Sequence, residues 1–186
     1  MKDGVDNKNS SLCAAHITTL KESVPLVLNG AGLGALLKGE ARVIIKPNLV
    51  EAIMPPVTTP VALVGEVVKY IQENAPHIEI IIADGTGSLE YDTTYVFKEL
   101  GYLEMSRALG VRLVDLNEEE SVLLEIDGCT RWPEFYLPRI VMDSFLLSVP
   151  VLKAHTLAGV TLTMKNMVGL APPSRYQQGG HWRKSA

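Results

Sequence analysis

The sequence predicts an α/β fold in which a mostly parallel sheet carries helices on both faces, a Rossmann-like three-layer architecture. Short, continuous aliphatic runs with polar stops are typical of strands buried on both faces. These runs alternate with longer helical patterns, and that alternation favours parallel strands joined by crossover helices. The predicted strands are residues 42–45, 78–83, 111–114 and 145–149.

Helices are expected before and between these strands. Residues 18–28 should pack before the first strand, and residues 93–109 should form one or two short helices broken near Gly101. Another helix should begin with Pro60 at its first position and take its cap from Thr58 or Thr59. Its apolar stripe consists of Val61, Val64, Val67, Val68 and Ile71.

The C-terminal half departs from this alternation. Residues 122–126 are expected to form a strand of a small antiparallel excursion, followed by a turn at Asp127-Gly128. The apolar spacing of residues 155–168 predicts a last helix, which Gly169 and Pro172-Pro173 should end.

Size and composition favour one soluble domain. The chain has 186 residues and a net charge of −4, which argues against a nucleic-acid partner. No apolar run is long enough to span a membrane. We expect a flexible tail over residues 1–17, a single domain over residues 18–186, a natural polypeptide that continues past Ala186, and a cytoplasmic location. The sequence leaves open whether the chain forms a homo-oligomer.

The glycine-rich segment 30–35 fits the G-x-G-x-x-G/A pattern of dinucleotide-binding loops, with Glu51 near the expected acidic position. The preceding residues have a helical pattern, whereas the motif requires a strand there. We therefore expect these glycines to end a helix and form a short turn.

Polar residues follow each predicted strand. Ligands of open α/β sheets bind outside the carboxyl ends of the strands, so these residues are expected to share one edge of the sheet. The candidate residues are Lys46, Asn48, Asp84, Gly85, Gly87, Asp115, Lys153 and His155.

The lysines are the most informative of these residues. An ammonium at the end of a buried strand is costly unless an anion lies nearby. Asp84 or Asp115 could provide that anion and merely tie the edge together, or a ligand could provide it. Three lysines, Lys46, Lys153 and Lys165, favour a ligand.

Each candidate has an expected role. Asp84, His155 and Lys153 are the predicted catalytic residues, because they could transfer protons; Asp84 and His155 could alternatively hold a metal. The predicted ligand-binding residues are Lys46, Asn48, Gly85, Gly87, Asp115, Lys165 and Asn166. The two glycines are expected to expose backbone N–H groups to an anion.

Four segments together resemble a known family. They are VIIKPNLV (43–50), IADG (82–85), SVPVLKAH (148–155) and LAGVTLTMKNMVGL (157–170). The chain is similar, from about Thr18 onward, to the domain of unknown function 362 family, which has no settled biochemical activity. Some members are iron–sulfur proteins because they carry a ferredoxin-like segment elsewhere. Cys13 and Cys129 belong to no cluster-binding motif, so no cluster is expected within this chain, and the cofactor is unknown.

The sequence therefore leaves three functions open. The first is binding of a small anionic metabolite at the carboxyl ends of the strands, either for catalysis or for binding alone. The second is a substrate-binding module of an iron–sulfur redox protein. The third is a non-catalytic domain in which the charges only pair with one another.

Overall fold

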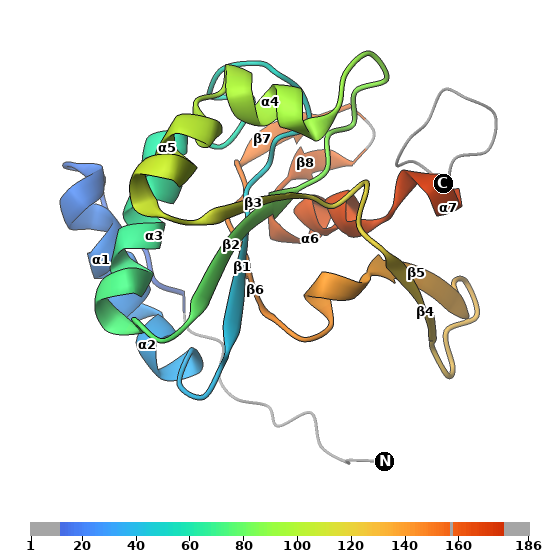
Figure 1. Cartoon of the computed structure of the whole chain (residues 1–186), viewed down its shortest axis with the longest axis horizontal. Coiled ribbons are helices and arrows are strands. Elements are labelled where there is room, and N and C mark those ends of the chain that lie inside the picture. Colours follow the sequence, from blue (N-terminus) through green and yellow to red (C-terminus); the bar gives the residue numbers. More distant parts are fainter. Residues whose placement is uncertain (1–11, 157, 177–186) are drawn as a thin grey trace.

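A four-stranded, all-parallel sheet forms the centre of the computed structural model, which describes residues 12–156 and 158–176 (Figure 1). Its strand order is β3-β2-β1-β6. The strands are β1 (Arg42–Lys46), β2 (Glu79–Asp84), β3 (Arg112–Asp115) and β6 (Phe145–Ser148). All four predicted strands are confirmed. The first three end one residue later than predicted, so that Lys46, Asp84 and Asp115 are the last residues of their strands.

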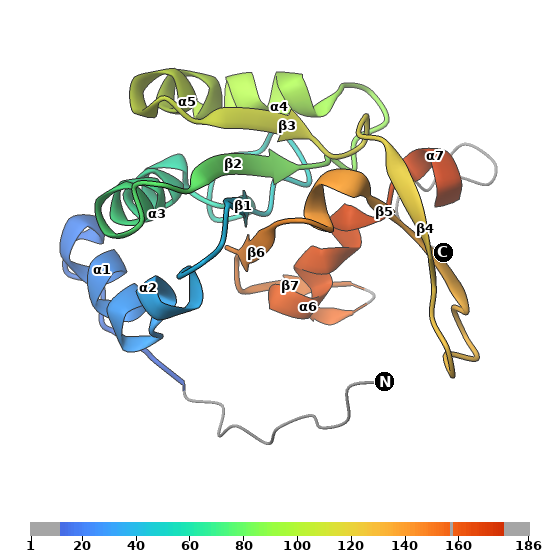
Figure 2. The same cartoon turned by 60° about the horizontal axis from the view of Figure 1, so that its bottom comes forward.

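The helices that precede β3 in the chain cover one face of the sheet (Figure 2). They are α1 (Leu20–Gly30), α2 (Leu33–Leu36), α3 (Val61–Asn74), α4 (Thr93–Glu99) and α5 (Tyr102–Leu109). Successive side chains of a strand point to opposite faces. Val43 and Ile45 therefore pack into the core beneath these helices, whereas Ile44 packs into a second, smaller core on the other face.

Short elements cover that second face. Leu170 packs against Ile44 and Ile81 there, together with Ile140 and Met167. The covering elements are the 3-10 helices η1 (Arg139–Val141) and η2 (Met167–Leu170) and the helix α6 (Thr163–Asn166). Helices thus flank both faces as predicted, although the long ones are all on one side.

The antiparallel excursion is confirmed. Strands β4 (Ser121–Glu125) and β5 (Glu134–Pro138) pair antiparallel beside the main sheet. Gly128 lies in the turn between them with a φ of 78°, a left-handed conformation that glycine adopts without strain.

The predicted helix over residues 155–168 is wrong in its first part, and the chain is helical only from Thr163 onward. Strands β7 (Lys153–His155) and β8 (Gly159–Thr161) form an antiparallel hairpin there, and α6 begins only at Thr163. Gly159 has a φ of 71°, and the β-branched residues that follow it favour extended backbone. Leu157, part of the apolar pattern, is outside the described residues. Met164, another member, is 89% exposed, so the spacing did not reflect a buried helical face.

The predicted cap of α3 is also wrong. Pro60 is itself the cap residue, and no side chain bonds to the start of the helix. The Thr59 hydroxyl instead accepts a 2.9 Å hydrogen bond from the backbone N–H of Asn48 and donates a 2.9 Å bond to the Val149 carbonyl. This threonine therefore connects the segments that leave β1 and β6.

The glycine-rich segment behaves as expected. Gly30 is the last residue of α1, and Gly32, with a φ of 70°, precedes α2. Both helices come before β1, so this segment lacks the preceding strand that a dinucleotide-binding loop requires. Among the described residues, no helix is long and apolar enough to cross a membrane.

Candidate functional site

The site lies where the strand order reverses. From β1 the chain builds outward to β2 and β3, then crosses back to place β6 on the free side of β1. Ligands of open parallel sheets bind outside the carboxyl ends of the strands at such a reversal. Lys46 pairs with Ser148 across it, and the Val149 N–H donates a 2.8 Å hydrogen bond to the Lys46 carbonyl.

A buried ion pair occupies the ends of β1 and β2. Lys46 Nζ donates to Asp84 Oδ1 at 2.5 Å, and the two residues are only 1% and 2% exposed. Backbone N–H groups of Leu49 and Gly85 also donate to this carboxylate, at 2.6 and 2.8 Å. Two charges removed from water need such dense hydrogen bonding to offset the loss of hydration.

Asn166, from α6, holds this pair in place. Its side-chain oxygen accepts hydrogen bonds from Lys46 Nζ at 3.2 Å and from the side-chain Nδ2 of Asn48 at 3.3 Å. Its nitrogen donates to the Lys46 carbonyl at 3.1 Å and to the Ser148 hydroxyl at 3.0 Å. The residue is 2% exposed. One amide thus joins β1, β6 and α6 around the reversal.

A cavity of about 100 Å³ opens beside the ion pair. We call it the rim cavity. It is lined by Lys46, Asn48, Val50, Asp84, Gly85, Gly87, Lys165, Asn166, Val168 and Gly169. Seven of these ten residues were candidates from sequence, and they come from the ends of β1 and β2 and from α6 and η2. The structure therefore brings together most of the predicted site.

Two further lysines give this region positive charge. Lys165 lines the rim cavity, and Lys153 donates a 2.8 Å hydrogen bond to the side chain of the lining residue Asn48 and another to the Val57 carbonyl. Within residues 12–156 and 158–176, no carboxylate oxygen lies within 4.0 Å of either ammonium. Asp84, the one carboxylate in the lining, is bound to Lys46.

Burial lowers the pKa of the Lys153 ammonium below its usual value. The positive charge of Lys165 lowers that pKa further, whereas the negative charge of Asp84 acts in the opposite direction. The two lysines are therefore close enough to repel each other. A negative charge bound between them would relieve that repulsion.

Three candidates do not line the rim cavity: Lys153, which reaches it only through Asn48, and Asp115 and His155. Asp115 accepts hydrogen bonds from the Thr93 hydroxyl at 2.7 Å and the Asn117 N–H at 2.9 Å. It thus fixes the start of α4 and the turn after β3 and does not pair with a lysine. His155 lies in the β7–β8 hairpin, where its Nδ1 accepts from the Ala158 N–H at 3.1 Å.

Gly85 and Gly87 both line the rim cavity, and their backbone N–H groups already donate hydrogen bonds within the chain. The Gly85 N–H donates to Asp84, and the Gly87 N–H donates to the Val50 carbonyl at 3.0 Å. Both amides therefore have acceptors within the chain. Gly87 allows close approach, because a Cβ there would lie 3.2 Å from a Val50 methyl group.

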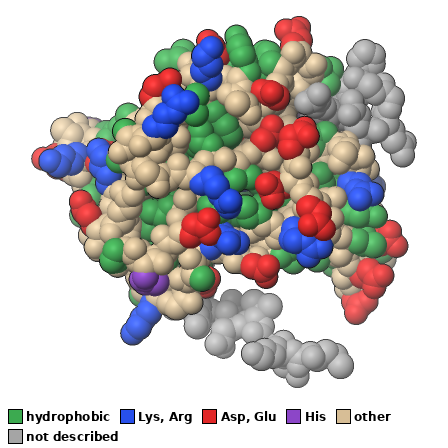
Figure 3. Space-filling model, viewed as in Figure 1, with side chains coloured by type: hydrophobic (Ala, Val, Ile, Leu, Met, Phe, Trp, Pro, Cys, Tyr) green, Lys and Arg blue, Asp and Glu red, His purple; other side chains and the backbone are tan. Residues whose placement is uncertain are grey.

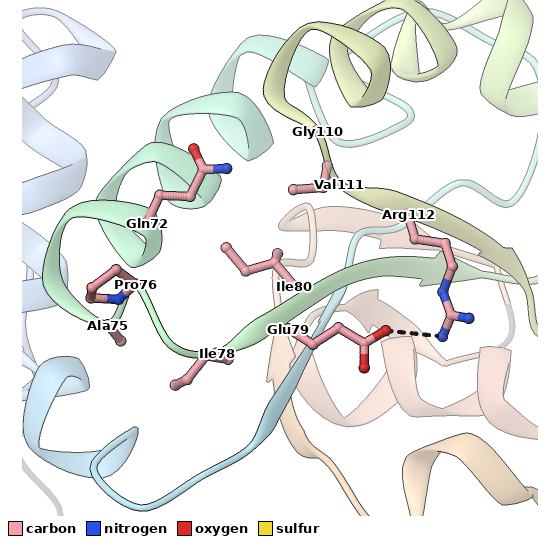
Figure 4. A pocket seen from close by; sticks show the side chains of 9 residues that line it. All are labelled: Gln72, Ala75, Pro76, Ile78, Glu79, Ile80, Gly110, Val111 and Arg112. Carbon is pink, nitrogen blue, oxygen red and sulfur yellow. Dashed lines mark ion pairs between the residues drawn. The ribbon is translucent and has the colours of Figure 1, made fainter.

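A larger cavity, of about 500 Å³, lies at the opposite edge of the sheet (Figure 4). It is lined by the starts of β2 and β3 and the end of α3. Its charged groups, Glu79 and Arg112, form an ion pair at 3.4 Å and are 44% and 55% exposed. An exposed pair of this kind is well hydrated and contributes little to stability, and it leaves no buried charge to be neutralised by a ligand.

A comparison with known protein families identifies the family of this chain. The family model described as Domain of unknown function (DUF362) matches residues 43–185, more than half of the sequence. The chain belongs to the DUF362 family. The DUF362 match begins at β1 and includes every residue that lines the rim cavity. Neither a curated protein nor a solved structure matches this DUF362 chain.

Sequence reasoning missed several parts of this DUF362 site. Val50, Val168 and Gly169 line the cavity, and Ser148 and Thr59 connect its walls. Gly169 was expected only to end a helix. A Cβ at this glycine would lie 2.6 Å from Lys46 Nζ, so its missing side chain makes room for the ammonium. The MKNMVG stretch around it gave a signal, because glycine beside polar residues in an apolar run often marks close packing.

Proposed function

We propose that this chain binds a small anionic metabolite in the rim cavity. Lys165 and Lys153 would bind the negative group, and Asn48 would orient it. One observation carries the proposal: the two ammonium groups repel each other, and in the described part of the chain no carboxylate lies within 4.0 Å of either. The purely structural alternative required Asp84 and Asp115 to neutralise Lys46 and Lys153, but Asp115 bonds to Thr93 and Asn117.

The size of the rim cavity limits what it can enclose. A water molecule occupies about 30 Å³ in the liquid, so roughly 100 Å³ admits a carboxylate or phosphate group but not a whole cofactor. The rest of the ligand would extend outward past Lys165 and Val50.

Catalysis would use the groups that lie nearest the anion. Lys153 is the best-placed proton carrier, because its lowered pKa brings the neutral amine closer to physiological pH. Asp84 is bound to three donors and would act by positioning Lys46. The iron–sulfur alternative would use the same cavity to present a substrate to a cluster carried elsewhere, and the complete natural sequence tests it.

Calorimetric titration with inorganic phosphate and with acetate tests the binding proposal. Lys165→Ala and Lys153→Ala should each weaken binding at least about tenfold, because a charge-assisted hydrogen bond contributes about 1.5–3 kcal/mol. Lys38→Ala is the matched control, since Lys38 is exposed and precedes β1 at the opposite edge of the sheet. Failure of both anions to bind, or affinities that survive both cavity substitutions, would overturn the proposal.

A further inference from the structure

The rim cavity has two kinds of wall. Its floor is polar and buried, formed by Lys46, Asp84 and Asn166, which are each at most 2% exposed. Its lining also includes two aliphatic side chains, Val50, which is exposed, and Val168, which is half-buried. A hydrated inorganic ion would leave these two side chains uncovered.

Exposed apolar side chains also lie close in sequence to both of these residues. Val50 is 40% exposed, and it is followed in the same loop by Ile53 at 50% and Met54 at 65%. On the other flank, Met164 is 89% exposed and lies four residues before Val168. Both residues belong to the α6–η2 segment. We call Val50, Val168 and Met164 the apolar lip.

We propose that the ligand is an amphiphilic anion: a carboxylate or phosphate head group that carries an aliphatic or aromatic body, with the head in the rim cavity beside Lys165 and the body on the apolar lip. This inference rests on the proposed function and specifies its ligand class. Charge complementarity to Lys165 and Lys153 fixes the orientation of the head. The small volume of the cavity forces the body outward, onto the half-buried Val168 and the exposed Val50 and Met164.

The test compares probes that share a head group and differ in their body. Acetate is titrated against hexanoate, and methyl phosphate against hexyl phosphate. Each methylene fully removed from water is worth about fourfold in affinity. Hexanoate, with four additional methylenes about half buried on the lip, should therefore bind on the order of tenfold more tightly than acetate.

Substitutions test whether the apolar lip causes the higher affinity for hexanoate. Val50→Ser and Met164→Ser should each lower the hexanoate-to-acetate affinity ratio, whereas Leu26→Ser should leave it unchanged. Leu26 is a suitable control because it is 63% exposed on α1, away from the cavity. Lys165→Ala should weaken hexanoate as well as acetate. Hexanoate binding that survives this substitution would show that the chain holds it elsewhere, and it would overturn the inference.

The outcomes separate this inference from the function it rests on. Equal affinities for short and long probes would overturn the amphiphilic ligand and leave the anion site standing. No binding of any probe would overturn both. A dimer seen by sedimentation velocity that Met164→Ser dissociates would assign the lip to a second copy of the chain, and it would also overturn the inference.

Discussion

Gly169 lies directly against the Lys46 ammonium: a Cβ added to this glycine would be 2.6 Å from Nζ and 3.1 Å from Asp84 Oδ1. The buried ion pair thus depends on a position without a side chain, contributed by a segment more than 80 residues away from Asp84 in the sequence. The polar floor of the cavity and the C-terminal segment are therefore expected to form together.

Gly169→Ala should destabilise the chain by about 1–3 kcal/mol, the usual cost of forcing an extra carbon into a packed interior. Urea denaturation followed by circular dichroism measures it. Gly34→Ala is the control: the nearest atom to its Cβ would be the Tyr70 hydroxyl at 3.9 Å, an ordinary contact. If both substitutions have the same effect, Gly169 is not packed on the ion pair as described.

The Lys46–Asp84 pair should show strong coupling in a double-mutant cycle. Lys46→Met or Asp84→Leu alone leaves an unpaired buried charge and should cost about 3–5 kcal/mol. The double substitution removes both charges and should cost clearly less than the sum. Glu120→Gln, which removes a charge of the exposed pair with Arg139, should shift the denaturation midpoint little. Additive single effects would contradict a direct buried pair.

Lys153 should make stability depend on alkaline pH. Its pKa is lowered in the folded chain, so between that pKa and the ordinary value of 10.5 the unfolded chain binds more protons. The free energy of unfolding contributed by this residue therefore rises with pH in that window. Lys153→Gln abolishes the rise, so its stability relative to the unmodified chain should fall between neutral pH and 10.5. Lys38→Gln should show no such trend.

Tyr102 should have the opposite effect at higher pH. It is completely buried, donates a 2.8 Å hydrogen bond to the Thr59 carbonyl, and has its pKa raised far above 10.0 by burial and then by the charge of Asp84. Its stabilising contribution is fully present below pH 10.0 and is lost as the pH rises further, because the unfolded tyrosine ionises first.

The Tyr102→Phe variant tests this expectation. At neutral pH it should lose about 1 kcal/mol, the worth of one hydrogen bond. Above pH 10.0 the gap to the unmodified chain should narrow, as followed by denaturation at increasing pH. Tyr95→Phe serves as control because Tyr95 is 44% exposed. A gap that stays constant with pH would contradict the burial of the phenol.

The face shown in Figure 3 has basic and acidic side chains interspersed, with no continuous basic region. On this face the charges are balanced, in keeping with the net charge of −4. Single charge substitutions such as the lysine controls are therefore expected to act locally.

The four central strands were predictable from sequence because strands buried on both faces must be continuously apolar, as in Val43-Ile44-Ile45. Because the strands are parallel, the polar residues at their carboxyl ends were expected to share one edge of the sheet. The β7–β8 hairpin was not predictable in this way. Its apolar residues Val160 and Leu162 are exposed, at 48% and 45%, so their spacing carries no information about a core.

The sequence by itself determined the α/β class and the gathering of Lys46 and Asp84 at one edge, since short-range periodicity and strand polarity are written locally. The tertiary structure decided that Lys165 and Asn166 reach the same edge, because the helix expected over residues 155–168 begins only at Thr163. Only the tertiary structure decided which groups bond to which. It pairs Asp84 with Lys46 and Asp115 with Thr93, and it leaves Lys153 beside Lys165. Hydrogen bonds and charges act over a few ångströms in space, and residues as far apart as 48 and 166 meet only after the chain has folded.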